Sequence, residues 1–141
     1  MRFGNKKIRV VLDTNVYISA IIIGGVCEKL FEEIQKRDFK IFISPFLIQE
    51  IIKVLKKKFK WDDEMIQFVI CFLLEKAILI YPQKEVFIIK EKEDDNRILE
   101  LALEAKAHFL ISGDKKHILP LKKINHTQII SPKNFLKILK N

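Results

Sequence analysis

Short apolar runs alternate with longer amphipathic segments along this chain, and that alternation is what most constrains its fold. Runs of about four apolar residues are too short for helices but suit buried strands. Between them, apolar residues recur at helical spacing, as Cys27, Leu30, Phe31 and Ile34 do. Such alternation predicts a parallel sheet covered by helices on both faces, an α/β fold. The expected strands are 10–12, 40–43, 78–81, 108–111 and 128–130.

Local signals mark where helices begin. Ser44-Pro45 and Ser131-Pro132 each place a capping serine before a first-turn proline. The segment after residue 62 is apolar almost all round, so its helix is either deeply buried or partly a surface for a partner. The expected helices are 16–23, 27–36, 45–57, 62–74, 94–105 and one from 132 onward.

Length and composition favour one domain, residues 1–141, with a core of its own. The chain is 49% apolar with only 4 Gly and 4 Pro, which excludes a collagenous or disordered protein.

The basic N-terminus is followed by an apolar stretch that breaks at Asp13, too short for a signal peptide or membrane span. We therefore expect a cytoplasmic protein without a membrane partner. Cys27 and Cys71 are expected to be buried and reduced.

The charge balance points to a polyanionic partner. Lys and Arg number 26 against 18 Asp and Glu, a net charge of +8, and 22 of the cations are lysines. Lysine suits contact with phosphate and gives little base-specific recognition. Lys115 and Lys116 are candidates for touching substrate phosphate, although both could simply be exposed.

Four carboxylates are candidates for one site. Asp13 follows the first strand and Asp114 the fourth, and ligands of open parallel sheets bind at the carboxyl ends of strands. Glu50 borders the apolar face of its helix, and Asp95 follows Asp94 at a helix start. Each also has a purely structural interpretation: the aspartates could cap helices or shape turns, and Glu50 could reach solvent.

A cluster of four acids makes sense mainly when a divalent cation neutralises it. Oxygen ligands favour Mg²⁺ or Mn²⁺ over Zn²⁺, since no His or Cys falls nearby at ligand spacing. Such a cation can deprotonate a water and hold both oxygens of an in-line displacement. An acidic metal site on a basic protein therefore suggests phosphodiester hydrolysis.

Four segments, in order, resemble the motifs of the PIN-domain family, and the closest subgroup is the VapC-like toxins of toxin–antitoxin pairs. The resemblance spans almost the whole chain, and in the third motif it selects Asp95 over Asp94. The segments are VVLDTNV (10–16), SPFLIQEI (44–51), DDNRILELA (94–102) and FLISGDKK (109–116).

The resemblance implies a three-layer α/β/α sandwich with a five-stranded parallel sheet, the first strand beside the fourth. It also implies Mg²⁺- or Mn²⁺-dependent endoribonuclease action on RNA and a cognate antitoxin protein as partner. Asp13, Asp95 and Asp114 would hold the metal, and Glu50 would bind metal or position the attacking water. Orientation of these carboxylates would fall to Thr14, Asn15 and Ser112.

Two departures from the family pattern bear on a second metal. Relatives often carry Asp-Pro before the third motif, where this chain has Glu91-Lys92-Glu93. Many also carry an acid two residues after the fourth-motif aspartate, where this chain has Lys116.

Several alternatives stay open. They are a housekeeping RNA-processing or DNA-acting PIN nuclease, and a non-catalytic RNA-binding PIN domain. Other acidic α/β folds fit less well: a receiver domain needs adjacent acids after its first strand, and a haloacid dehalogenase needs Asp-x-Asp where this chain has Asp13-Thr14-Asn15. The apolar helix around residues 65–74 could form a homodimer face or accept an antitoxin segment.

Overall fold

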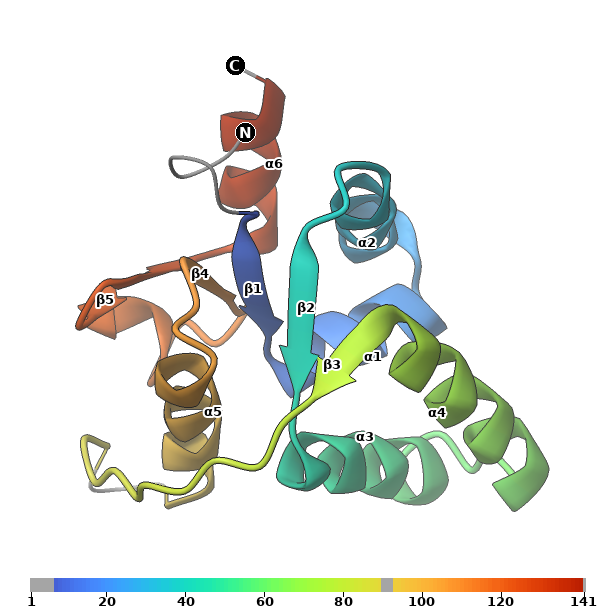
Figure 1. Ribbon diagram of the computed structural model, residues 1–141. Helices are drawn as coiled ribbons and strands as arrows, with labels where there is room; N and C mark the ends of the chain where they lie inside the picture. The colour runs from blue at the N-terminus through green and yellow to red at the C-terminus, as the bar shows by residue number, and fades with distance from the viewer. Residues whose placement is uncertain (1–6, 90–92, 141) are drawn as a thin grey trace.

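The protein is a central twisted sheet flanked by helices on both faces, as the computed structural model shows for residues 7–89 and 93–140 (Figure 1). The strands lie in the order β3-β2-β1-β4-β6-β5. Their bounds are β1 Arg9–Leu12, β2 Lys40–Ile43, β3 Ala77–Leu79, β4 Phe109–Ile111, β5 Lys123–Ile124 and β6 Thr127–Ile130.

The order of the inner strands determines where the functional edge lies. β1 pairs in parallel with both β2 and β4, with Val11 opposite Phe42 on one side and Leu110 on the other. β3 and β6 extend the sheet in parallel beyond β2 and β4. The first and fourth strands are therefore neighbours, as expected, and their carboxyl ends point to the same edge.

The prediction of a purely parallel, five-stranded sheet is wrong at one edge. β5 is a sixth strand, and it pairs antiparallel with β6 through Lys123–Gln128 and Ile124–Thr127. The two strands are joined by a turn of two residues, in which Asn125 has a positive φ of 50°, a conformation that asparagine tolerates better than most residues. A strand of two residues produces no apolar run, so periodicity could not detect it.

Six α-helices flank the sheet in the described part of the chain, and several begin where the sequence indicated. Asp13 and Ser44 cap α1 and α3, and the Ser44 hydroxyl accepts from the Leu47 amide at 3.2 Å. The bounds are α1 Thr14–Ile22, α2 Gly25–Lys36, α3 Pro45–Lys57, α4 Asp63–Lys76, α5 Glu93–Glu104 and α6 Pro132–Lys140; a short 3₁₀ helix, η1, spans Leu119–Leu121.

The core forms between the sheet and its helices. Three residues in each of β1, β2 and β4 are buried. α6 is anchored by Phe135, whose ring packs edge-on against Phe109 with centroids 4.9 Å apart and against Phe39 at 6.5 Å. This packing fixes α6 against the amino-terminal part of the sheet and α2.

α4 presents part of its apolar surface to solvent. Met65, Phe68 and Phe72 are exposed, whereas Ile66 and Leu73 are buried. Of the two interpretations of this helix, deep burial is therefore wrong for its outer face. The expectation for the cysteines holds at Cys27, which is buried, and fails at Cys71, which lies on the exposed side of α4.

No single helix among the described residues is long and apolar enough to cross a membrane; α1 and α2 satisfy length and composition only as a pair bent by 105°. The expectations about the N-terminal residues 1–6 and about Glu91-Lys92 fall outside the described residues.

Candidate active site

Two aspartates meet where β1 and β4 end. The Asp13 amide continues the strand pairing by donating to the Ile111 carbonyl at 2.9 Å. The Ser112 hydroxyl donates to Asp13 Oδ2 at 2.7 Å and accepts from the Asp114 amide at 3.0 Å. One buried hydroxyl therefore connects the ends of both strands and holds the two acids near each other.

Asn15 makes a second connection between the same two segments. Its Nδ2 donates to Asp13 Oδ2 at 3.3 Å, and its Oδ1 accepts from the Gly113 amide at 2.9 Å. A Cβ atom at Gly113 would lie 3.3 Å from Asn15 Oδ1, a tight contact. Glycine therefore allows the asparagine to approach the backbone closely.

Glu50 reaches the same edge from α3. The Thr14 hydroxyl, on the first residue of α1, donates to Glu50 Oε1 at 3.1 Å. Burial raises the pKa of Glu50, and the charges of Asp13, Asp94 and Asp95 raise it further, against the Thr14 hydrogen bond. The glutamate is therefore part of the acidic group and does not extend away from it into solvent.

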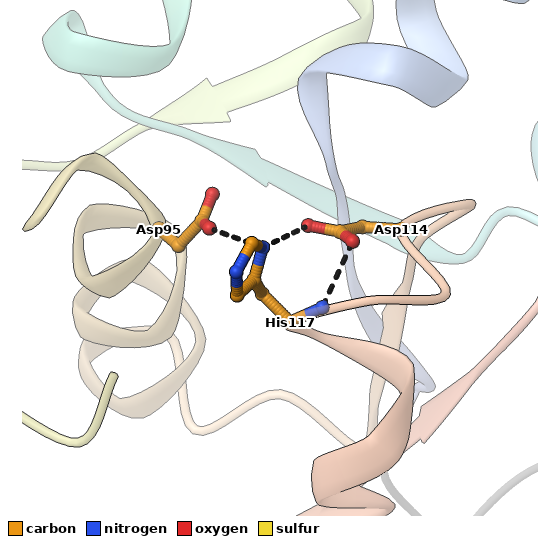
Figure 2. A group of neighbouring side chains, drawn as sticks. All are labelled: Asp95, Asp114 and His117. Atoms are coloured by element: carbon orange, nitrogen blue, oxygen red, sulfur yellow. Dashed lines mark hydrogen bonds and ion pairs between the residues drawn. The ribbon is translucent and has the colours of Figure 1, made fainter. Parts of the chain in front are cut away.

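Asp95, Asp114 and His117 form a compact group (Figure 2). His117 Nδ1 lies 3.5 Å from Asp95 Oδ2 and 3.9 Å from Asp114 Oδ2. One ligand atom from each of the three side chains lies within 4.8 Å of the others. The expectation that no histidine falls near the acids at ligand spacing is therefore wrong.

A turn after β4 explains why His117 points inward. Asp114 Oδ1 accepts from the amides of Lys116 at 2.9 Å and His117 at 3.0 Å, so the chain folds back over its own carboxylate. The spacing Asp-x-x-His was the available signal, but only this turn directs the imidazole toward α5. The side chains of Lys115 and Lys116 remain exposed beside the site.

Neighbouring carboxylates raise the proton affinity of Asp13 and of Glu50. Burial raises the pKa of Asp13, and the charges of Asp95 and Asp114 add to this effect, opposed by the hydrogen bonds from Ser112 and Thr14. The charges of Asp13 and Asp95 act in turn on Glu50. The four predicted carboxylates therefore form one electrostatic group. Asp94 is exposed and lies at its border.

A buried asparagine, which the sequence analysis missed, positions the helix that carries Asp95. Asn96 accepts from the Ile89 amide at 2.8 Å and donates to the Ile89 carbonyl at 2.7 Å. One turn further along α5, Glu100 Oε2 accepts from the Val86 amide at 3.0 Å and pairs with Arg97 at 2.7 Å. The segment before α5 is thereby fixed to the helix that bears the acid.

Comparison with known proteins identifies the family. A PIN domain family model matches residues 9–116. The chain belongs to the PIN domain family. All four acids lie within the matched residues, including Asp95 and Asp114 of Figure 2. His117 lies one residue beyond the match.

Other known proteins resemble this chain over most of its length. The uncharacterized protein MJ1680 of Methanocaldococcus jannaschii is 31% identical over 144 residues, covering 93% of this chain and 91% of its own. The solved structure of VapBC2 from Rickettsia felis, bound to a promoter DNA fragment, contains a chain similar to this protein, with a TM-score of 0.65 and 17% identity. The match covers 88% of this protein and 98% of the VapBC2 chain.

A further solved structure has the same fold. VapBC-1 from nontypeable Haemophilus influenzae contains a chain with a TM-score of 0.65 and 19% identity, covering 89% of this chain and 99% of that chain. The expected resemblance to VapC is confirmed at the level of family and fold.

Proposed function

We propose that this PIN domain, taken as one nuclease domain over the whole chain, is a metal-dependent endoribonuclease that hydrolyses RNA phosphodiester bonds. The observation that carries the proposal is the convergence of four carboxylates from four separate segments on one edge of the sheet. Such a concentration of negative charge is unfavourable by itself, and a bound cation relieves it.

The donor set fits a divalent cation. Asp95 and Asp114 supply carboxylate oxygens, the ligands that Mg²⁺ and Mn²⁺ prefer, and His117 adds one nitrogen. Asp13 lies beside this group, and the charges of Asp95 and Asp114 act on it. We assign these aspartates to metal binding and Glu50 to metal binding or to orienting the attacking water. When bound, the cation would lower the pKa of that water and stabilise charge on the phosphate.

The neighbouring side chains orient the acids. Ser112 and Asn15 hold Asp13 Oδ2, and the Thr14 amide donates to Asp13 Oδ1 at 2.8 Å. The Thr14 hydroxyl holds Glu50 Oε1, so the fold fixes both carboxylates. Ligands held in this way lose little freedom when a cation binds. Lys115 and Lys116, exposed beside Asp114, are assigned to attraction of the RNA phosphates.

The test is cleavage of labelled RNA with Mg²⁺ or Mn²⁺, with and without EDTA, by the wild type and by Asp13→Asn. We expect metal-dependent cleavage by the wild type alone. Cleavage in EDTA, or equal cleavage by the variant, would contradict the mechanism. Single-stranded DNA of the same sequence is included, since preferential cleavage of DNA would favour a DNA-acting nuclease, and binding without cleavage a non-catalytic domain.

We further propose that the protein is the toxin of a toxin–antitoxin pair acting in the cytoplasm. A hollow of about 480 Å³ between α1, α2 and α4 supports an antitoxin partner. Phe68 and Phe72 line it together with Glu28 and Glu32, so it suits an apolar segment that carries a basic residue. Tyr17 also lines the hollow, and its buried hydroxyl has no hydrogen-bond partner among the described residues.

Expression in a host cell tests the toxin proposal. We expect growth arrest that Asp13→Asn abolishes and that co-expression of a small protein encoded beside this gene relieves. Phe68→Ser should abolish that relief while leaving RNA cleavage intact. Harmless overexpression and the absence of any small neighbouring reading frame would instead favour a housekeeping nuclease. The mass of the purified protein in solution tests the predicted homodimer.

A further inference from the structure

The net positive charge of this protein is concentrated in its last 27 residues. All 18 acidic residues and 19 of the 26 basic residues lie at or before Asp114, so the first 114 residues are nearly neutral. The remainder, residues 115–141, contains seven lysines and no aspartate or glutamate. Asp114, an acid of the proposed site, therefore stands at the boundary between a balanced region and a purely basic one.

The fold gathers this basic region on one side of the acidic group. Residues 115–140 form η1, β5, β6 and α6: β6 and β5 build one edge of the sheet, and α6 leads from the end of β6 to α2. α3 and α4 lie toward the opposite, β3 edge (Figure 1). Among the described residues, the segment that leads from the acidic site through β6 into α6 therefore carries lysines and no acid of its own.

A hollow of about 570 Å³ begins next to the site on that side. Its lining includes Lys115, Lys122, Ile130 and Ser131. The hollow is one strand from the acids, because the Ser112 amide donates to the Ile130 carbonyl at 3.1 Å. Lys115 is also the residue that follows Asp114, so a phosphate could pass from the acidic group into this hollow.

A second hollow, of about 400 Å³, lies between α6 and α2. Lys133, Lys137 and Lys140 line it from α6, at positions that share one helix face, and Lys29 lines it from α2. None of these four lysines forms an ion pair with a carboxylate of the described residues. Lys133 follows Pro132, where α6 begins at the end of β6, so this face continues from the first hollow.

We propose that single-stranded RNA extends from the acidic group across this basic track, with its phosphates along Lys115, Lys122 and the lysine face of α6. Lysine contacts would bind the backbone without selecting bases, because an ammonium group is a point charge. The inference rests on the proposed RNA substrate, but it makes a separate claim about where RNA binds.

The test compares two triple variants that each remove three positive charges. The first is Lys133→Gln with Lys137→Gln and Lys140→Gln on α6. The matched control is Lys57→Gln with Lys58→Gln and Lys76→Gln, exposed lysines of the α3 and α4 ends. Affinity for a single-stranded RNA of about 16 nucleotides is measured in EDTA at several salt concentrations, so that no metal-dependent cleavage interferes.

We expect the α6 variant to bind about 50-fold more weakly at physiological salt and to lower the salt slope by about 2, since each phosphate contact to a single strand contributes about 0.7. The control variant should bind nearly as the wild type does. The corresponding Lys→Arg triple should retain binding.

Equal loss in both Lys→Gln triples would overturn the track, because only net charge would then matter. If the α6 variant binds RNA as tightly as the wild type does, the track is also overturned. This holds even if the variant has lost binding to an acidic protein, since the lysines would then serve that partner and not RNA. Because binding is measured without metal, the outcome is independent of the proposed nuclease activity. Failure of the wild type to cleave RNA would contradict the activity while leaving the selective loss of binding interpretable.

Discussion

The Ser112 hydroxyl and the Asp13 carboxylate form a 2.7 Å hydrogen bond that joins the ends of two neighbouring parallel strands. The same hydroxyl accepts from the Asp114 amide, so it acts on both aspartates at the ends of β1 and β4. One buried, uncharged side chain thus connects two acids that repel each other, beside the second connection that Asn15 makes. This relationship makes Ser112 a positioning residue whose removal should affect both stability and activity.

Ser112→Ala should lower the free energy of unfolding by about 1–2 kcal/mol, because Asp13 Oδ2 loses a donor and the Asp114 amide loses an acceptor. It should also lower the metal affinity of the site, measured by titration calorimetry. Asp62→Ala is the matched control: it removes the cap of α4, at a similar cost of about 1 kcal/mol. If both variants bind metal alike, Ser112 does not position the acids.

Divalent metal should stabilise the folded wild type. At a concentration 100 times the dissociation constant, binding adds about 2.7 kcal/mol to the free energy of unfolding, measured as a shift of the melting temperature. Asp114→Asn should lose most of this shift, because a proposed ligand becomes neutral. Asp63→Asn, at an exposed acid paired with Lys56, should keep the full shift. An equal shift in both variants would place the metal elsewhere.

Glu50→Gln should stabilise the metal-free protein near neutral pH, by at most about 1 kcal/mol because solvent screens this half-buried group. Burial and nearby carboxylates raise the pKa of Glu50 in the folded state. Between the ordinary and the raised pKa the folded protein binds more protons than the unfolded chain, so stability falls as pH rises through that window. Glutamine can still accept the Thr14 hydrogen bond.

Chemical denaturation of the metal-free protein as a function of pH measures this effect. The wild type should lose stability as pH rises above the ordinary carboxyl range, and Glu50→Gln should lose less. Glu64→Gln, at an exposed position in the first turn of α4, serves as the control and should follow the wild-type pH profile. A variant profile parallel to the wild type would show that Glu50 is not coupled to the other acids.

His117→Asn should weaken metal binding by about 10- to 100-fold if the imidazole holds the cation or its ligands. The reason is its position, 3.5 Å from Asp95 and 3.9 Å from Asp114. His126→Asn, in the exposed turn between β5 and β6, is the matched control. Tighter metal binding by His117→Asn would contradict a ligand role and indicate that the imidazole competes with the cation for these carboxylates.

Much of the fold could be predicted because its signals are local. Apolar runs of strand length, the Ser44-Pro45 and Ser131-Pro132 pairs, and helical spacing each depend on a few neighbouring residues. The order of β1 beside β4 came from the family resemblance, not from periodicity, and the structure confirms it. β5 went unpredicted because pairing with β6, and not an apolar pattern, defines it.

The sequence by itself determined the chemistry available to this protein: four carboxylates at strand ends and helix starts, in the order of the PIN motifs, on a lysine-rich chain. Only the tertiary structure decided which other groups join them. His117 reaches Asp95 because a turn around Asp114 folds the chain back, and Asn96 fixes α5 through a segment that has no periodicity. Contacts between distant segments depend on how strands and helices pack, and no local pattern encodes that packing.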